Sequence, residues 1–400
     1  MSFASDAFPI AGFAFTGLAV GLAAWCGQSA QLCLLALPVA AGMARRRHHV
    51  FALMFGYFGA GSASLPGVVG VFFHGGAAAW MAYGAPTALA FVLALPFLLY
   101  APAARWPWRA AGYLAALATL TVPPVGMLAW MNPLMVAGTL FPGAGGAGVI
   151  AAALVFAGLA ALPSRVAAGA ALLPAILGLV ATRFVPAPAA LPGFVTINTA
   201  AGPGRSAHDE SNDTHRIARM IRAALGVPGV RAIVLPESIV SPYRPVDDAI
   251  LFDAGRQAAH LGVSVVFGAI LLQDADGTSW RDAVMGTGTL ASNGSPRVID
   301  DPRLLMPVGN WHLGLSGGAT PHPFSTDRGV LAGLPIAWSV CYEDTELWSH
   351  GFLLFGHPAA MVSMRNDWAL RGTFSLRIQT LSAQQLARMA GVPLVVAENT

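Results

Sequence analysis

The sequence contains no lysine, and it carries little charge of any kind. All 22 of its Lys/Arg-type side chains are arginines, charged residues make up 10% of the 400 positions, and hydrophobic residues make up 56%. The mean hydropathy is +0.62. These values exclude an ordinary soluble protein and indicate a chain that lies at least partly in a membrane.

Acidic residues are missing from one long part of the chain. None occurs between Phe8 and Leu191, and the acids gather in the second half. The segment VPAPAALPG between the two parts is rich in proline, which is typical of a domain boundary. We therefore expect a helical membrane domain over 1–185, a linker over 186–192 and a second domain over 193–400.

The first part contains about seven apolar stretches close to the ~20 residues that a helix needs to cross a bilayer. They cover 8–26, 29–44, 50–72, 78–100, 110–130, 146–162 and 166–184. Charged residues inside spans usually mark an ion or proton path, and these stretches lack them apart from Arg183 at the end of the last one. The pattern predicts a multi-pass bundle and argues against a transporter or channel.

Arginines predict the orientation of this bundle, because cytoplasmic loops carry an excess of arginine. With the N-terminus inside, the loops after the second, fourth and sixth stretches hold Arg45–Arg47, Arg105 with Arg109, and Arg165, and the opposite loops hold none. An odd number of spans then places the second domain in the periplasm of a bacterial inner-membrane protein. The RRRHH run at 45–49 is thus a topology determinant, and we expect no direct nucleic-acid binding.

The first stretch is expected to remain as a helix. A cleaved signal peptide starts with positive charge, whereas the leader MSFASDAF contains Asp6. A lipoprotein signal has a small residue before its cysteine, whereas the bulky Trp25 precedes Cys26.

Three cysteines offer no disulfide framework. Cys26 and Cys33 flank the first turn and are expected to be packed thiols, which leaves Cys341 unpaired in the second domain. An unpaired thiol in an oxidising compartment is a liability, so its presence there favours a chemical role. We expect no metal and no cofactor, because the adjacent His48 and His49 do not share a helix face and FPGAGGAG lacks the Lys-Ser/Thr of a phosphate-binding loop.

The second part alternates strand and helix patterns. Strand patterns occur in GFVTINTA, VRAIVLPES, VSVVFGAILL, DAVMGTGTLAS, LPIAWSV, PAAMVSM and VPLVVAENT, and helical patterns in SNDTHRIARMIRAALG, AILFDAGRQAAHLG and SLRIQTLSAQQLARMAG. This alternation predicts a layered α/β domain. Its functional side chains are expected where the strands end.

Two of these strand ends carry complementary chemistry. Cys341 follows LPIAWSV, and Glu237 follows VRAIVLP. A thiolate attacks carbonyl carbon, and a carboxylate in a low-dielectric pocket has a raised pKa and accepts a thiol proton. The N–H of Tyr342 is placed to stabilise the resulting oxyanion. Taken singly, each residue also fits an ordinary role, a packed thiol or a turn carboxylate.

The order of LPES (235–238), SVCYED (339–344) and RNDW (365–368) resembles the carbon-nitrogen hydrolase (nitrilase) superfamily. The resemblance implies an α-β-β-α sandwich and a Glu-Lys-Cys triad. A multi-span half before such a domain is similar to the apolipoprotein N-acyltransferases of bacterial inner membranes. Within that group, WCGQ (25–28) and GYFGAGSASLPGVVGVFF (56–73) are most similar to the TraB family of conjugative plasmids.

The resemblance implies a thioester mechanism, with Cys341 as nucleophile and Glu237 as base. The residues it assigns to support are Tyr342, Glu343, Asn366, Asp367 and Trp368. The acyltransferases take an acyl chain from a phospholipid and pass it to the N-terminal amine of a lipoprotein. The partners implied are therefore membrane phospholipid and either a lipoprotein N-terminus or the conjugation machinery.

The departures from the family pattern concern its lysine and its second glutamate. The counterpart segment is PRLLMPVGN (302–310), which puts Pro302 at the lysine position and Asn310 at the glutamate position. Arg303 is the nearest substitute, but neighbouring side chains of a strand face opposite ways, and a guanidinium does not reproduce an ammonium. The chain also stops after VPLVVAENT, where the family continues with closing strands and a last membrane helix, which implies a domain that is shortened or completed differently.

Two hypotheses from different classes follow. One is an acyltransferase-like enzyme that uses Cys341 and Glu237 in plasmid transfer. The other is a catalytically degenerate membrane scaffold of the conjugation apparatus. The absent lysine favours the scaffold, and the retention of Glu237, Cys341, Tyr342, Glu343 and Asn366 together favours the enzyme.

Overall fold

The computed structural model describes residues 4–73, 75–76, 80–200, 207–274, 276–291, 293–307, 310 and 318–400. The chain forms two compact units. The helical unit comprises Met1–Ala187, Thr345–Trp348 and Gly372–Gly391. The sheet unit comprises Pro188–Asp344, Ser349–Arg371 and Val392–Thr400.

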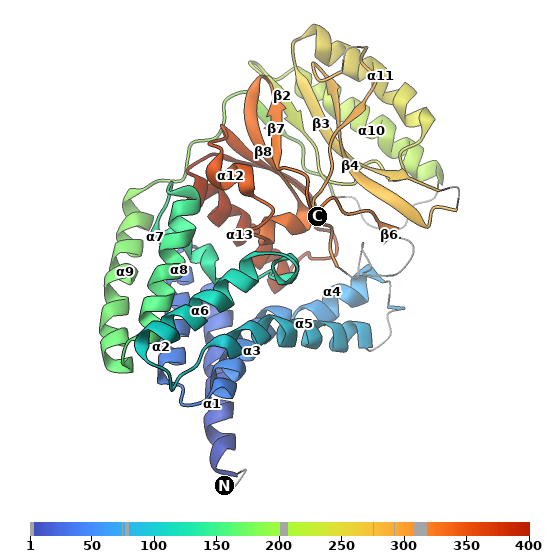
Figure 1. Cartoon of the computed structure of the whole chain (residues 1–400). Coiled ribbons are helices and arrows are strands. Elements are labelled where there is room, and N and C mark those ends of the chain that lie inside the picture. Colours follow the sequence, from blue (N-terminus) through green and yellow to red (C-terminus); the bar gives the residue numbers. More distant parts are fainter. Residues whose placement is uncertain are drawn as a thin grey trace. The chain divides into compact units, whose positions relative to one another are not determined.

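The helical unit consists of helices with short irregular connections (Figure 1). Its elements are α1 (Ala4–Ala24), η1 (Ser29–Leu35), α2 (Ala36–Met43), α3 (Arg47–Ser62), α4 (Leu65–Phe72), η2 (Trp80–Gly84), α5 (Ala85–Ala94), η3 (Leu95–Leu99), α6 (Trp106–Thr121), η4 (Val125–Leu128), η5 (Pro133–Val136), α7 (Ala137–Leu140), α8 (Gly145–Ala161), α9 (Ser164–Phe184) and α13 (Phe374–Ala390). The expected helical N-terminal part is thereby confirmed.

The prediction of about seven spans is not confirmed. In the part of the chain that the structure describes, three helical stretches are long and apolar enough to cross a membrane, Arg47–Phe72, Trp80–Leu99 and Ser164–Phe184. A fourth is possible if Pro133–Leu140 and Gly145–Ala161, which meet at 116°, form one broken span. The other predicted stretches are helical but short: Ser29–Met43 begins as a 3₁₀ turn, and α6 ends at Thr121, two residues before a Pro-Pro pair.

Close backbone contact joins α1 to α3. A Cβ added at Gly17 would lie 1.8 Å from the carbonyl oxygen of Leu53, and one added at Gly56 would lie 2.0 Å from the carbonyl oxygen of Ala14. Only glycine permits such an approach, and small residues at helix interfaces are a frequent feature of membrane bundles. The apolar sequence of α1 is thus packed by shape as well as by hydropathy.

One arginine connects three turns of the helical unit. Arg109 Nη2 donates hydrogen bonds to the carbonyl oxygens of Gly42 and Ala160 at 3.1 and 2.8 Å, and to the hydroxyl of Tyr100 at 2.9 Å. These residues lie near the ends of α2, η3 and α8. The three arginine-bearing turns that follow these elements therefore lie at the same end of the unit.

Helix α13 belongs to the helical unit, although its sequence lies between two strands of the sheet unit. Arg388 Nε donates to the carbonyl oxygen of Gly138 at 2.9 Å, and its Nη2 donates to the carbonyl oxygen of Ala181 at 3.0 Å. Gln385 Nε2 donates to Thr139 Oγ1 at 3.0 Å. Polar side chains on the buried face of α13 thus satisfy carbonyl and hydroxyl groups of apolar helices, as buried polar groups require.

The sheet unit contains two sheets (Figure 1). The strands are β1 (Phe194–Thr196), β2 (Ala232–Val234), β3 (Ser264–Leu272), β4 (Ser279–Gly288), β5 (Arg297–Asp300), β6 (Gly318–Ala319), β7 (Arg328–Leu331), β8 (Leu334–Val340), β9 (Ala360–Asn366) and β10 (Leu394–Asn399), and the helices are α10 (Ala207–Leu225), α11 (Pro245–His260), η6 (Cys341–Thr345) and α12 (Gly351–Phe355). The first sheet has the order β1-β2-β3-β4-β5, with β6 beside β4, and the second has the order β10-β9-β8-β7.

Alternation along the strands builds two cores. On β2, Ile233 packs with α10 and α11, whereas Ala232 and Val234 pack with Trp338 of β8 and Val362 of β9. The two sheets therefore lie face to face, with α10 and α11 on the outer face of the first (Figure 1). This arrangement agrees with the predicted layered α/β domain.

Candidate active site at Cys341

Cys341 stands at a strained turn directly after β8. Its φ is +49°, in the left-handed region that non-glycine residues rarely adopt. Such a conformation costs of order 1–3 kcal/mol and persists only where the surroundings enforce it. Strand, strained turn and the short helix η6 thus project a half-buried thiol from the end of the second sheet.

Glu237 lies three residues after β2 and is 3% exposed. Its side chain hydrogen bonds with Cys341. The backbone at Glu237 and Ser238 packs closely against β3 at Gly268. A Cβ added at Gly268 would lie 2.5 Å from the Glu237 Cα and 2.3 Å from the Ser238 nitrogen. Burial, and then the charge of Asp282, raise the pKa of the Glu237 carboxyl well above its usual range. The structure thus brings together the two predicted catalytic residues.

Asp282 is a third side chain of this site, and the sequence reasoning missed it. It lies on β4, is 2% exposed, hydrogen bonds with Glu237, and accepts a hydrogen bond from Ser238 Oγ at 3.3 Å. Burial raises the pKa of Asp282 to about 6. The available signal was an acid at the head of the strand run DAVMGTG, where apolar residues are expected.

The loop after β9 approaches the thiol from the second strand end. Burial, followed by the charges of Glu237 and Asp367, raises the pKa of the Cys341 thiol well above its usual range, and a backbone hydrogen bond from Asn366 opposes that rise. Asn366 is itself held, since its Oδ1 accepts from Asn399 Nδ2 at 2.7 Å. Trp368 follows in the same loop and is half-buried.

Glu343 and Arg303 form a buried ion pair beside the turn. The guanidinium donates through Nε to Glu343 Oε1 at 2.9 Å and through Nη2 to Glu343 Oε2, and the Arg303 backbone N–H also donates to Oε1. Glu343 Oε2 accepts from the N–H of Val340 at 2.9 Å. The pair therefore fixes Val340, directly before Cys341, and Glu343, two residues after it.

The remaining nitrogen contacts of Arg303 are also accounted for. Nη1 donates to Asp300 Oδ2 and to the carbonyl oxygen of Thr326, each at 3.3 Å, and Nη2 donates to the carbonyl oxygen of Trp338 at 3.1 Å. The arginine is thus committed to Glu343 and its surroundings. It therefore does not replace the lysine that the resemblance implied.

The other residues of the family pattern are placed as follows. Pro302 is buried beyond the end of β5, and Tyr342 is half-buried in η6. Asn310 donates its N–H to the carbonyl oxygen of Met306 at 2.9 Å, and its own carbonyl oxygen accepts from the N–H of Ala319 at 2.7 Å. Among the described residues, no group of three or more His, Cys, Asp or Glu side chains is arranged to hold a metal ion.

Asp344 anchors the turn to the second sheet. Its Oδ1 accepts from Ser339 Oγ at 2.6 Å, and its Oδ2 accepts from Ser363 Oγ at 2.8 Å and from Arg365 Nε at 2.6 Å. Ser339 lies on β8, and Ser363 and Arg365 lie on β9. A fully buried carboxylate thus joins two parallel strands beneath the cysteine.

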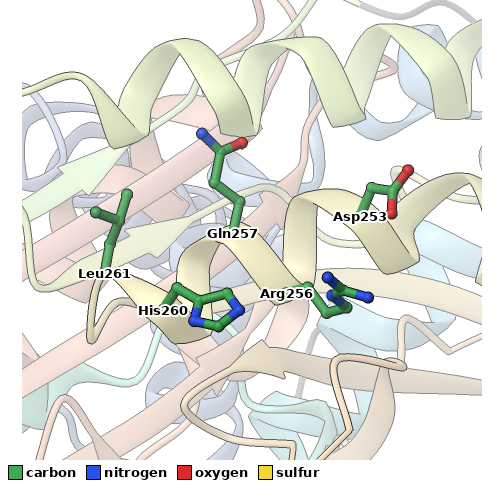
Figure 2. Close-up of a pocket in the computed structure, with 5 residues that line it drawn as sticks. All are labelled: Asp253, Arg256, Gln257, His260 and Leu261. Atoms are coloured by element: carbon green, nitrogen blue, oxygen red, sulfur yellow. The ribbon is translucent and has the colours of Figure 1, made fainter.

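A surface pocket of about 300 Å³ lies on α11 (Figure 2). Its lining is Asp253, Arg256, Gln257, His260 and Leu261, all from that helix and the turn after it. None of these residues belongs to the constellation around Cys341. The pocket therefore adds nothing to the candidate site.

The chain was compared with protein-family models, solved structures and curated proteins. No family model matches the chain. Solved structures of a nitrilase-superfamily amidase from Nesterenkonia AN1 match 52% of this chain and 76% of theirs at 12% identity with a TM-score of 0.35, too low to carry an argument.

Two curated relatives match along almost the whole length. The conjugal transfer protein TraB of Agrobacterium fabrum (strain C58 / ATCC 33970) is 32% identical over 415 aligned positions, covering 99% of this chain and 94% of the relative. The probable conjugal transfer protein TraB of Sinorhizobium fredii (strain NBRC 101917 / NGR234) is 30% identical, covering 96% of each. The chain therefore belongs to the TraB family of conjugal transfer proteins.

Proposed function

We propose that this protein is a multi-pass component of the bacterial inner membrane that serves plasmid conjugal transfer, and that Cys341 carries an acyl group as a thioester. The sheet unit faces the periplasm in this proposal. The observation that carries it is the strained Cys341 turn with its thiol hydrogen bonded to the buried Glu237. A packed thiol needs neither the strain nor the buried carboxylate.

The helical unit supports a membrane location. Helix α9 has side chains that are apolar and exposed along its length, among them Leu172 at 62%, Leu173 at 64% and Phe184 at 76%. Exposed apolar surface of this extent marks an interaction with lipid or with another protein. Arg109 supports the orientation, because it holds the arginine-bearing turns at one end of the unit, as an excess of cytoplasmic arginine requires.

The chemistry follows from the groups around the thiol. Cys341 attacks the ester carbonyl of a phospholipid, its proton passing to Glu237. A C–S bond forms, the C–O bond to glycerol breaks, and the glycerol oxygen takes up that proton. An amine, on a lipoprotein N-terminus or a conjugation partner, then attacks the thioester. A C–N bond forms, the C–S bond breaks, and a proton from the amine passes through Glu237 to the sulfur, which restores the thiol.

A degenerate scaffold is the second candidate, and one observation favours it. The two buried arginines beside the site, Arg303 and Arg365, are paired with Glu343 and Asp344. The thiol therefore faces carboxyl groups with no lysine, and losing a single oxyanion donor typically lowers a rate by about 10²–10³. In this alternative the polar core keeps the fold, and the membrane role does not use the thiol.

Acyl transfer from a tagged lipid distinguishes these functions. Membranes containing the full chain are incubated with phospholipid that carries an alkyne-tagged acyl chain, and label on the protein is tested for release by neutral hydroxylamine. Labelling that is lost in Cys341→Ala and kept in the control Cys33→Ala supports the enzyme. If wild-type protein takes up no hydroxylamine-sensitive label, and Cys341→Ala transfers plasmid at the normal frequency, the scaffold is correct.

A further inference from the structure

The side chains of Glu237 and Asp282 form a carboxyl pair in the candidate site. Asp282 lies on β4 opposite Ile270 of β3, two positions from Gly268, where the Glu237 backbone packs against the sheet. Glu237 and Asp282 hydrogen bond to each other and are both at least nine-tenths buried. Strand register, and not sequence proximity, therefore creates the pair.

No cation is among the described groups that act on this pair. The groups that face it are the Cys341 thiol after β8, Glu343 in η6 and Asp367 after β9, besides the Ser238 hydroxyl. One oxygen of each partner, Glu237 Oε2 and Asp282 Oδ2, has no hydrogen-bond partner among the described residues. Two carboxyl groups in contact in a dry site cannot both ionise, so they hold one proton between them.

We propose that Asp282 shares its proton with Glu237, so that the base serving Cys341 is the carboxyl pair and not Glu237 alone; this rests on the function proposed above. When the S–H bond breaks, Glu237 gains the thiol proton and its own proton crosses to Asp282. One negative charge moves from the pair to sulfur, and no proton leaves the site. Asp282 thereby acts through Glu237 as a positioning residue for the proton.

The pair explains how a site without lysine keeps a base. An ammonium beside Glu237 would hold that carboxylate ionised, whereas burial alone leaves it protonated and unable to accept. Asp282 supplies the missing acceptor once the pair has lost its first proton. That loss falls near the pKa of about 6 that burial gives Asp282.

The test is the pH dependence of Cys341 alkylation by iodoacetamide in the full chain, in a Cys26→Ala/Cys33→Ala background. In wild type the rate should rise to about pH 6 and then change less than about twofold between pH 7 and 8, because the pair and not free thiolate limits it. In Asp282→Asn and in Glu237→Gln, labelling should be slow and rise about tenfold per pH unit, as for unassisted thiolate. Asp274→Asn, a carboxylate in the turn of the same β3–β4 hairpin, should keep the wild-type profile.

A double variant shows whether the two carboxyls act as a unit. Asp282→Asn should change nothing further in the Glu237→Gln background. Should Asp282→Asn fail to fold, Ser238→Ala removes the hydroxyl donor to Asp282 and should move the bend to higher pH. A wild-type profile without a bend, a bend that survives Asp282→Asn, or one that ignores Ser238→Ala would each overturn the proposal.

These outcomes are separable from those for acyl transfer, because alkylation needs no acyl donor. A bend that depends on Asp282, together with no hydroxylamine-sensitive label, would reject the proposed function and keep the carboxyl pair. Label without such a bend would reject the pair and keep the function.

Discussion

Replacing Arg303 with alanine tests whether the ion pair with Glu343 holds the cysteine turn in place. The two side chains are 1% and 0% exposed. Without the guanidinium, the Glu343 carboxylate keeps, among the described residues, the backbone donors of residue 303, Leu304 and Val340. Leaving a buried charge without its partner costs about 3–5 kcal/mol.

That loss is large enough to measure in the full chain. For a unit of roughly 200 residues, each kcal/mol moves the melting temperature by about 2–4 °C, so the expected fall is roughly 6–20 °C. The assay is thermal unfolding in detergent followed by tryptophan fluorescence, with Trp338 as a buried reporter whose carbonyl oxygen contacts Arg303. Cys341 alkylation should also lose its dependence on Glu237, because the turn is no longer fixed.

Arg281 provides the matched control, since it pairs with Asp301 in the same unit with side chains that are 33% and 18% exposed. Exposed pairs contribute about 1 kcal/mol or less, so Arg281→Ala should lower the melting temperature by no more than about 4 °C. The double change Arg303→Met with Glu343→Leu should recover part of the loss, because it removes both charges. Equal melting temperatures for Arg303→Ala and Arg281→Ala would refute the idea that the Arg303–Glu343 ion pair holds the cysteine turn in place.

Three further predictions follow from backbone strain, helix packing and proton linkage. Cys341→Gly should unfold at a higher temperature than Cys341→Ala, by about 1 kcal/mol in stability, because glycine adopts a φ of +49° without strain; equal stabilities would contradict the strained turn. Gly17→Ala should destabilise the helical unit by about 1–3 kcal/mol in detergent melting curves, since its Cβ would lie 1.8 Å from a carbonyl oxygen. The control is Gly12→Ala on the same helix, whose Cβ meets no atom within 4 Å and which should be neutral in the same curves. Folding raises the pKa of Asp282 from 3.8 to about 6, so protonated Asp282 contributes to the stability of the folded protein fully below pH 3.8, and this contribution is lost as the pH rises through 6. The melting temperature of Asp282→Asn should therefore rise relative to that of wild type between pH 4 and pH 7. Parallel curves of melting temperature against pH would count against a buried, titrating Asp282.

Local signals in the sequence identified the strand ends that carry Glu237 and Cys341. The apolar runs before them predict buried strands, and both side chains follow such runs at a turn. The division into a helical part and a sheet-containing part also followed from composition, because no acid occurs between Phe8 and Leu191. The catalytic roles of these residues stay predictions.

The sequence marks Asp282 as an unusual acid in a strand, but it does not predict the residue that Asp282 contacts. Its contact with Glu237 depends on the register of β4 against β3 and on the bare backbone of Gly268, and neither is encoded near position 282. Helix α13 is a similar case, because its amphipathic pattern predicts a buried face but not which helices pack against that face. The count of seven spans is not confirmed for another reason. Hydropathy does not show where a 3₁₀ turn or a proline pair interrupts a helix.

The segment Cys341–Asp344 shows how neighbouring residues in the sequence make separate tertiary contacts. Glu343 and Asp344 are adjacent, yet they bind different arginines, Arg303 in the segment after β5 and Arg365 on β9. Two buried networks therefore anchor the turn from two directions, which is what a residue at a φ of +49° requires if its strain is to persist. Both of these arginines are engaged in holding the turn. In the mechanism proposed above, the reaction therefore starts from a neutral thiol, whose proton passes to the Glu237–Asp282 pair.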